Sequence, residues 1–236
     1  VACASFGVGV WCDVLRFGYA RELVNRCQRS VLYGCMVFCR TVSTDAMQVL
    51  MGELPWDLEF LRRGVMFRAK RGVRVGELGW LQIRLEEGEN LEKKGVLDAK
   101  LWEIWQRRWD MSEKGRVTHD FVPSVRFASE NVWFEPGMFG LFLLTGHGSM
   151  NEFLNKRGLS DTDLCGCGRV ENVSHIVFEC GLYDEERRSC EWSGWIGEEE
   201  RRFERLLESK EMYERLMGFA ERVFKKRRRM REGVTE

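Results

Sequence analysis

The sequence predicts a mostly α-helical protein that carries a small metal-binding module in its C-terminal part. Apolar residues recur at every third or fourth position in several long stretches, which is the period of an amphipathic helix. Only one stretch has the alternating character of a β-strand. A cluster of three cysteines and one histidine, spaced as zinc ligands can be, distinguishes the C-terminal part from the rest.

The N-terminal region begins with a predicted amphipathic helix from Tyr19 to Phe38. Its apolar positions follow three- and four-residue steps with arginines between them: Leu23, Val24, Cys27, Val31, Leu32 and Cys35. The run from Thr41 to Thr44 then offers an N-cap for a short helix from Asp45 to Met51, which Gly52 should end. A third helix is expected from Asp57 to about Lys70. This region should therefore form a compact group of helices.

The middle of the chain is predicted to be a helical connector. The glycines between Gly72 and Gly79 indicate a break before it. A long helix should then run from Glu86 to Arg108, with a stripe of large apolar residues at helical spacing: Leu97, Leu101, Trp102, Ile104, Trp105 and Trp109. We interpret this stripe as a packing face rather than as a cofactor site. The stretch from Thr118 to Phe134, around Pro123, predicts a short strand or an extended crossing.

A second compact unit is predicted to begin at Met138. An apolar turn there leads to the tight turn Gly146-His147-Gly148 and then to a short helix from Asn151 to Lys156. A final helix is expected after Gly197, with one apolar side made of Phe203, Leu206, Leu207, Tyr213, Leu216, Met217, Ala220, Val223 and Phe224. This helix should end in a basic run.

The Cys/His cluster has the composition of a structural zinc site. Its four candidate ligands are Cys165, Cys167, His175 and Cys180. Three thiolates and one imidazole complete the tetrahedron that zinc requires. Gly166 and Gly168 would let the chain turn sharply around the metal, because glycine lacks a Cβ atom. A helix should lie between the last two ligands, starting at or after His175 and ending before Gly181.

Other interpretations of these residues stay open at this point. The cysteines could be a core pair beside a surface histidine, and Cys190 or His147 could replace one of the four ligands. His147 lies between two glycines, where it could bind a metal or act in catalysis. We favour a structural role in which it hydrogen-bonds the start of a helix.

Two clusters of basic residues predict contacts with nucleic-acid phosphates. The first contains Arg62, Arg63, Arg68, Lys70, Arg71 and Arg74, and the second contains Lys225, Lys226, Arg227, Arg228 and Arg229. Phosphate backbones favour such local density, because each neutralised phosphate releases condensed counterions. The alternative is that each cluster is only the solvated face of a helix.

Length and composition set broad limits on the protein. The chain has 236 residues, of which 44% are hydrophobic and 31% charged, enough for one large domain or two small ones. Its 37 basic residues balance 37 acidic ones, so any case for nucleic acid depends on local clusters. Nine cysteines without a signal peptide favour a reduced, intracellular compartment. We find no membrane-spanning run, no P-loop, no dinucleotide fingerprint and no adjacent pair of aspartates.

Two stretches of the chain together resemble the reverse transcriptases of non-LTR, LINE-type retrotransposons. The first runs from Cys27-Gln28-Arg29 through Cys39 to Gly52 and on to Leu54-Pro55. The second is Leu144-Thr145-Gly146-His147-Gly148, followed by the Cys/His cluster and then by Tyr183 and Arg187. Both stand in the order of the family, and the resemblance is strongest to the arthropod type-1 elements of ribosomal DNA.

The resemblance implies that the chain is a C-terminal fragment of a retrotransposon Pol polyprotein. Residues 1–80 would be a thumb-like helical region, 81–135 a helical connector, and 136–236 a Cys3His zinc module with a basic C-terminal helix. The parent would be an RNA-directed DNA polymerase and endonuclease acting in target-primed reverse transcription. The polymerase aspartates, with their Mg²⁺, would precede Val1, which opens the chain without an initiator methionine.

The implied partners are element RNA, target DNA and the upstream polymerase domain, and the implied location is the nucleus and cytoplasm. The leading function is therefore nucleic-acid binding. The alternative is a zinc-stabilised protein-interaction module, in which the tryptophan stripe and the final helix would be the faces that partners bind.

Overall fold

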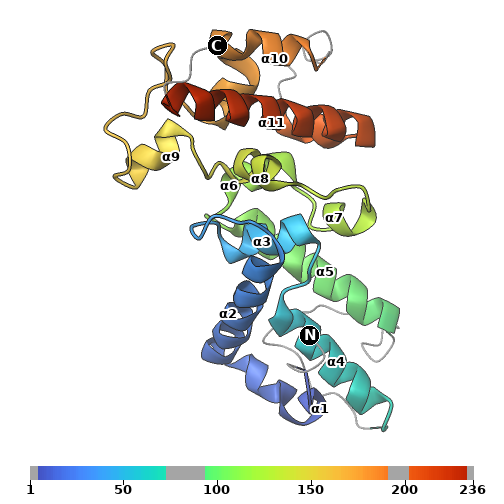
Figure 1. Cartoon of the computed structure of the whole chain (residues 1–236). Coiled ribbons are helices and arrows are strands. Elements are labelled where there is room, and N and C mark those ends of the chain that lie inside the picture. The colour runs from blue at the N-terminus through green and yellow to red at the C-terminus, as the bar shows by residue number, and fades with distance from the viewer. Residues whose placement is uncertain (1–4, 73–93, 191–201, 233–236) are drawn as a thin grey trace.

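The computed structural model describes residues 5–72, 94–190 and 202–232, and over these ranges the chain is built from helices (Figure 1). The described part contains no strand, and its β-structure is one isolated antiparallel bridge between Leu164 and Val170. The predicted mostly α-helical fold class is confirmed. None of the helices in these ranges combines the length and the apolar character that crossing a membrane would require.

The N-terminal group contains five helical elements: α1 (Val8–Trp11), η1 (Cys12–Arg16), α2 (Gly18–Cys35), α3 (Thr44–Met51) and α4 (Trp56–Ala69). The side chain of Ser43 caps α3 by accepting the N–H of Ala46 at 3.2 Å. Gly52 ends α3 in the left-handed conformation, with φ of 63°, and the backbone of Ser129 leaves no space for a Cβ atom there. The three predicted helices of this region are confirmed within a few residues.

A buried glutamine joins the first three long helices of the group. The Oε1 atom of Gln28 in α2 accepts the side-chain amide of Gln48 in α3 at 2.7 Å and the backbone N–H of Trp56 in α4 at 2.9 Å. Its Nε2 atom donates to the carbonyl of Leu54 at 3.0 Å. Because Gln28 is fully buried and every polar atom of its amide has a partner, it fixes how α2, α3 and α4 meet.

The connector helix α5 (Lys94–Met111) lies against α4. Trp105 and Trp109 are buried along it, and the indole N–H of Trp109 donates to the carbonyl of Val122 at 2.9 Å. The interpretation of the tryptophan stripe as a packing face is therefore confirmed. The predicted glycine break after Gly72 and the start of this helix before Lys94 lie outside the described residues.

The strand or extended crossing expected between Thr118 and Phe134 is wrong. This stretch forms two short helices, α6 (Arg116–Phe121) and α7 (Phe127–Glu130). Between them, the amide of Gln106 donates to the carbonyl of Pro123 at 2.8 Å and accepts the N–H of Val125 at 3.0 Å. A side chain of α5 thus satisfies the backbone groups that a neighbouring strand would otherwise pair. The β-branched residues Thr118, Val122 and Val125 are buried between helices instead.

The apolar turn expected at Met138 is also wrong, because α8 (Met138–Thr145) is a helix. Its residues are apolar on nearly every side, so the sequence carried no helical period to reveal it. The predicted helix from Asn151 to Lys156 is present with those bounds as α9.

The C-terminal unit then continues through η3 (His175–Glu179), η4 (Gly181–Tyr183), α10 (Asp184–Arg188), η6 (Phe203–Leu207) and α11 (Lys210–Glu232). The single final helix expected after Gly197 is in fact the short η6 followed by α11, whose start is capped by the hydroxyl of Ser209. The residues around Gly197 lie outside the described ranges. The predicted apolar side is buried, with Leu216, Val223 and Phe224 at its centre, and Phe219 is buried with it.

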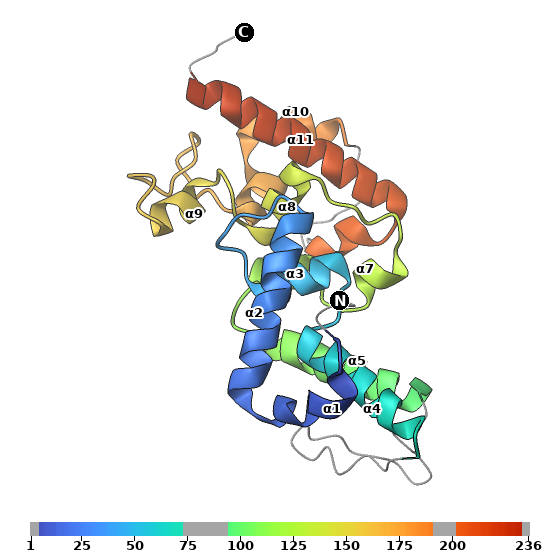
Figure 2. The ribbon, with the colours of Figure 1, turned by 60° about the horizontal axis from the view of Figure 1, so that its bottom comes forward.

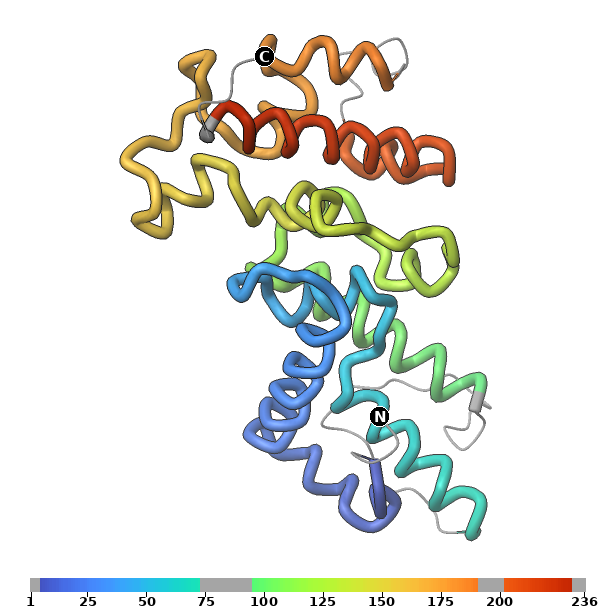
Figure 3. The backbone as a smooth tube through the Cα atoms, viewed as in Figure 1, coloured from blue at the N-terminus to red at the C-terminus, as the bar shows by residue number. Residues whose placement is uncertain are grey.

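The described helices are arranged in three tiers. Figure 1 shows α1 to α5 in one half, α6 to α8 in the middle, and α11 across the other half with α10 beside it, and Figure 2 shows α11 at the same end of the structure. The middle tier contacts both neighbours, since α6 packs on α3 and α8 packs on α11. The backbone trace in Figure 3 follows this order from the N-terminal to the C-terminal half. The metal-ligand candidates lie in the C-terminal tier, beside α11.

Candidate metal centre and nucleic-acid interface

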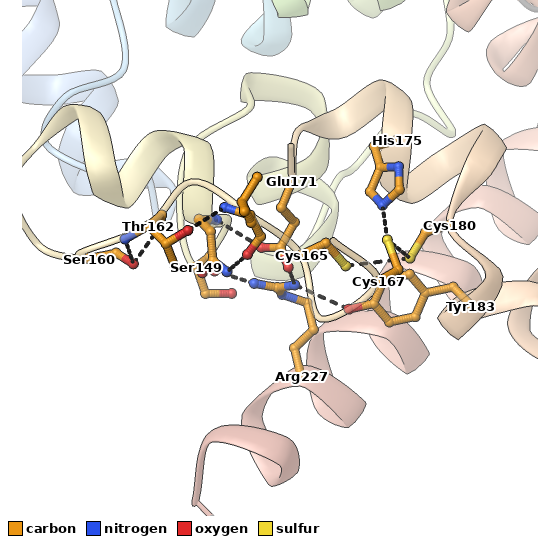
Figure 4. Close-up of polar contacts among 12 residues, drawn as sticks. Ser149, Ser160, Thr162, Cys165, Cys167, Glu171, His175, Cys180, Tyr183 and Arg227 are labelled. Carbon is orange, nitrogen blue, oxygen red and sulfur yellow. Dashed lines mark hydrogen bonds and ion pairs between the residues drawn. The ribbon is translucent and has the colours of Figure 1, made fainter. Parts of the chain in front are cut away.

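The four candidate ligands meet in one small space beside α11 (Figure 4). Their ligand atoms all lie within 4.8 Å of one another in the group Cys165, Cys167, His175 and Cys180. The Sγ atoms of Cys165 and Cys180 are 3.5 Å apart, and the Sγ of Cys167 lies 3.1 Å from the Nε2 of His175. A tetrahedral zinc site has ligand atoms about 3.6 to 3.8 Å apart, given its usual bond lengths. The cluster could therefore hold a metal ion without large rearrangement.

A tight hairpin presents the first two thiols. The N–H of Cys165 donates to the carbonyl of Arg169 at 2.7 Å, and the N–H of Gly168 donates to the carbonyl of Cys165 at 2.8 Å. Gly168 has φ of +88°, which favours glycine, so this position needs the residue that the sequence places there. Gly166 has no such conformation, and a Cβ atom there would meet Leu182 at 3.4 Å. Only one of the two glycines is therefore required by the turn itself.

A single helical turn presents the other two ligands. As predicted, it starts at His175 and ends before Gly181, with Cys180 directly after its last residue. The N–H of His175 donates to the side chain of Asn172 at 2.9 Å. Its Nδ1 atom lies 3.6 Å from the carboxylate of Glu179, which pairs with Arg169 at 3.1 Å. At this distance the carboxylate forms no hydrogen bond with the ring, and the buried Nδ1 atom has no hydrogen-bond partner among the described residues. A carboxylate on this side of the imidazole is nevertheless well placed to orient a histidine ligand.

The three thiols of the cluster differ in their pKa, and a bound metal ion would lower the pKa of each. Burial raises the pKa of Cys165 to about 12 and also raises the pKa of Cys180. The exposed Cys167 has a lowered pKa, chiefly because the backbone N–H of Arg169 stabilises its thiolate. A cation among the three would favour the thiolate form of all of them, so metal binding should release protons.

Tyr183 and Arg187, two residues that carry the family resemblance, stabilise the backbone around this cluster. The guanidinium of Arg187 is buried and donates to the carbonyls of Ile176 and Cys180 as well as to the carboxylate of Asp184. It thereby ties both ends of the helical turn that carries two candidate ligands. Tyr183 is buried beneath the cluster, and its hydroxyl accepts a hydrogen bond from Arg227 at 3.1 Å.

The two suggested substitute ligands lie elsewhere. The Nδ1 atom of His147 hydrogen-bonds the hydroxyl of Thr41 at 2.8 Å, two residues before the N-cap of α3, and its ring stacks on Phe153. Burial lowers the pKa of His147 to about 4, so its ring is neutral at pH 7. The thiol of Cys190, two residues after α10, accepts from the guanidinium of Arg222 in α11 at 2.7 Å and is buried against that helix. Neither belongs to the Cys/His group.

The second basic cluster is divided by the packing of α11. Arg227 is buried, and its guanidinium donates to the carboxylate of Glu171, to the hydroxyl of Tyr183 and to the carbonyl of Ser149 at 2.6 Å (Figure 4). The expectation that Arg227 projects toward phosphates is therefore wrong. The sequence could not reveal this, because the partner carboxylate lies more than fifty residues away.

The other members of this cluster differ in their exposure and in their contacts. The ammonium of Lys226 donates to the carbonyl of Leu182 at 2.9 Å and to the carboxylate of Glu186 at 2.7 Å. Lys225 is exposed and forms an ion pair with Glu221 at 2.5 Å. Arg228 and Arg229 are exposed. The outward face of the helix end thus carries Lys225, Arg228 and Arg229.

The first basic cluster is also largely engaged within the protein. Arg62 and Arg63 both bond the carboxylate of Glu59, at 2.7 Å and 2.6 Å. Arg68 makes a bidentate pair with Asp13, both bonds being 2.8 Å. The two exposed members are Lys70 and Arg71, whose guanidinium lies over the ring of Phe67, and Arg74 lies outside the described residues.

Sequence reasoning missed the acidic residues that support the site. Glu179 stands four residues after His175, a spacing that places both side chains on one side of a helical turn, so this signal was available. Glu171 gave no such signal. Its carboxylate accepts the N–H of Asn151 at 2.8 Å as well as the guanidinium of Arg227, and both partners come from other elements.

Comparisons with known proteins agree with the resemblance. The chain is 52% identical over 191 residues to the "Retrovirus-related Pol polyprotein from type-1 retrotransposable element R1" of Bradysia coprophila, which covers 79% of this chain and 19% of that relative. It is 38% identical over 235 residues to the protein named for element "R1 2" of Nasonia vitripennis, covering 98% and 56%. It is 41% identical over 241 residues to the "Putative 115 kDa protein" in element R1DM of Drosophila melanogaster, covering 96% and 22%.

Two further comparisons found nothing similar. No family model and no solved structure matches the chain. The chain spans 19%, 56% and 22% of the lengths of the three relatives, so what those whole proteins do extends beyond the residues compared.

Proposed function

This chain is similar, over most of its length, to Pol polyproteins of type-1 retrotransposable elements R1, and we propose its function from that similarity. In this proposal it is the nucleic-acid-binding and zinc-binding C-terminal part of such a polyprotein. Its partners are the element RNA, the target DNA and the polymerase domain of the same polyprotein. The parent acts as an RNA-directed DNA polymerase and endonuclease in target-primed reverse transcription.

The observation that carries the proposal is the junction of the Cys/His group with the basic end of α11. Glu171 lies four residues beyond Cys167, and its carboxylate binds Arg227 of α11 (Figure 4). The segment that carries the Cys/His group therefore fixes the position of the end of α11. The exposed side chains of Lys225, Arg228 and Arg229 project from this helix end. A fixed helix end suits phosphate binding, since little backbone freedom is then lost when its cations bind.

Zinc is the metal that best fits the ligand set. Thiolates are soft ligands that select zinc over magnesium or calcium, and three thiolates with one imidazole leave no open position for a substrate. The bound ion would stabilise the hairpin and the helical turn. The role assigned to it is structural.

Binding of a labelled RNA and a duplex DNA over a series of salt concentrations tests the proposal. The wild-type chain should bind both, with affinity falling steeply as salt rises. Replacing Lys225, Arg228 and Arg229 with Gln should lower the slope of log affinity against log salt by up to about one unit for each phosphate that is no longer bound. The same replacement of Arg188, Arg202 and Lys210, exposed cations outside the proposed interface, is the control. A wild-type chain that binds neither nucleic acid would refute the proposal.

One observation favours the second candidate function, a zinc-stabilised protein-interaction module. An apolar cavity of 330 Å³ opens beside α2, and exposed apolar residues such as Tyr19 and Leu23 lie along it. The two faces expected from the sequence do not support this function, because Trp105, Trp109 and the apolar side of α11 are packed inside the protein. Apolar docking would persist at high salt, whereas phosphate binding would not.

A further inference from the structure

Two cavities lined mostly by polar and charged residues meet at Arg29 near the end of α2, and together they form one groove. The first has a volume of 720 Å³ and the second 600 Å³. They share the lining residues Arg29, Thr44, Asp45 and Lys114. We call this feature the α2 groove. It runs from Gly18, past the start of α3, to His147 and Arg157 in the C-terminal half.

One face of α2 forms a wall of the groove. Its lining residues recur at steps of three and four: Gly18, Arg21, Glu22, Asn25, Arg26 and Arg29. Eleven residues of helix separate the first from the last, a distance of about 17 Å at 1.5 Å per residue. The groove is therefore long enough to follow an extended ligand rather than a small molecule.

The groove carries an excess of positive charge. Its cationic lining residues are Arg21, Arg26, Arg29, Arg108, Lys114 and Arg157, and its acidic ones are Glu22, Asp45 and Asp57. The carboxylate of Asp57 is already paired with Arg108 at 2.8 Å. Arg29 donates to the carbonyls of Arg40 and Val42, both at 2.7 Å, and so keeps its charge without a carboxylate partner among the described residues.

Three of these cations lie outside the two basic clusters seen in the sequence and have no carboxylate partner among the described residues. Arg26, Lys114 and Arg157 are exposed, and no carboxylate of the described residues forms an ion pair with them. By contrast, carboxylates neutralise Arg62, Arg63 and Arg68 of the first cluster, as they do Lys225, Lys226 and Arg227 of the second. The groove thus adds three exposed cations without a carboxylate partner among the described residues to the exposed Lys70, Arg71 and Arg228 of the two clusters.

Polar groups that suit an oxyanion complete the second cavity. The hydroxyl-bearing residues Thr41, Ser43 and Thr44 line it. Thr118 lines it as well, and its buried hydroxyl has no hydrogen-bond partner among the described residues. Such a hydroxyl favours a polar ligand over an apolar one, because an unpaired buried polar group is costly.

We propose that the α2 groove is the main track for the sugar-phosphate backbone of the bound nucleic acid, with Arg26, Lys114 and Arg157 as its phosphate contacts. This inference rests on the proposed function, because it takes the ligand class from it. Successive phosphates of one strand rise about 3.4 Å along the axis of a duplex but lie farther apart along the winding strand itself, so the α2 wall of about 17 Å spans a few of them. The track joins the N-terminal helices to the C-terminal unit, and both halves hold the same strand.

The test compares three triple variants by their salt dependence on one duplex DNA. The first changes Arg26, Lys114 and Arg157 to Gln, and its slope of log affinity against log salt should fall by up to about three units. The second changes Arg188, Arg202 and Lys210 to Gln, which removes the same net charge outside the groove and should leave the slope nearly unchanged. The third exchanges Arg26→Lys, Lys114→Arg and Arg157→Lys, and it should bind like the wild type.

A second measurement on the wild-type chain does not depend on any variant. Photo-crosslinking to a bromouridine-substituted RNA should label peptides from the groove wall, around Arg26 and Lys114. A wild-type chain that binds while the groove variant keeps the slope of the charge-matched control overturns the groove and leaves the proposed function standing. A wild-type chain that fails to bind at all overturns both.

Discussion

Arg227 is the residue whose role changes most between sequence and structure. In the sequence it is one of five consecutive basic residues, and in the fold it is the one with 5% exposure and three internal partners. Its neighbour Arg228 is exposed. A charged run on a helix samples every direction around the axis, so at least one member must face the protein.

Replacing Arg227 with Gln should destabilise the protein by about 3 to 5 kcal/mol, because it leaves the carboxylate of Glu171 buried without its cation. Replacing Arg228 with Gln should change the free energy of unfolding by less than about 0.5 kcal/mol. Urea unfolding of the two variants measures both values. Equal stability of the two would mean that the buried pair contributes nothing.

The zinc ligands give a second prediction at this scale. The purified chain should bind about one zinc ion, and Cys180→Ser should release it and loosen the residues from 163 to 183. Cys190→Ser is the matched control, since Cys190 is equally buried but lies outside the Cys/His group and should keep its metal. Metal analysis decides the matter, and full zinc in a double Cys165 and Cys180 variant would mean that the ligands are wrongly chosen.

His147 should make stability depend on pH. Its folded pKa is lowered to about 4 by burial, whereas the unfolded chain binds a proton near its ordinary value of about 6.5. The contribution of the neutral ring is therefore complete above pH 6.5 and is lost as the pH falls from there to about 4. The difference in Tm between wild type and His147→Gln should shrink between pH 7.5 and pH 5. A constant difference would contradict the lowered pKa, and protonation of the zinc ligands cancels in the comparison.

For individual residues, the sequence predicted only those groupings that depend on spacing along the chain. The four Cys/His residues could be grouped because zinc imposes a small set of spacings. The pairing of Arg227 with Glu171 and of Arg68 with Asp13 depends on how distant elements pack, and no pattern along the chain encodes it.

At the scale of elements, the close packing of α1 and η1 on α4 depends on Gly64. A Cβ atom there would lie 2.6 Å from the Cβ of Cys12, close to the backbone of η1. Gly64→Ala should therefore destabilise the protein by about 1 to 3 kcal/mol, although alanine favours a helix. Thermal unfolding of the purified variant measures the effect.

Gly140→Ala is the control for that prediction. A Cβ atom at Gly140 would meet the sulfur of Met217, which belongs to a flexible side chain that can move aside. This variant should lie within about 1 kcal/mol of the wild type. If both alanines are tolerated, the contact between η1 and α4 is looser than the structure has it.

The sequence predicted an element well where one side of it faces water. Helices α2, α3, α4 and α9 were all expected within a few residues, α2 from its amphipathic period and α3 from its cap at Ser43 and its end at Gly52. Helix α8 was missed because it is apolar all round, and α6 was missed because Thr118 and Val122 favour strands when considered alone. Burial between helices overrode that local preference.

At the scale of the whole molecule, the middle tier should separate two regions of different dependence on metal. Removing zinc by chelation should raise hydrogen exchange in residues 163–183 and in the end of α11 that Arg227 anchors. Exchange in α3 and α4 should change little, because Gln28 and a separate set of core residues hold them. Hydrogen-exchange mass spectrometry with and without chelator measures this. A uniform rise along the chain would mean that the metal stabilises the molecule as one cooperative unit.

The buried position of Arg227 also means that α11 tolerates no change of length between Phe224 and Arg227. Phe224 packs in the core and Arg227 reaches Glu171, and three residues of helix set the rotation between the two. Inserting or deleting one residue between them would turn the guanidinium by about 100° and shift it by about 1.5 Å along the axis. Either the packing of Phe224 or the ion pair of Arg227 would then break, whichever way the helix settled. Point substitutions at the exposed positions of this end should be tolerated, whereas single-residue changes of length should not.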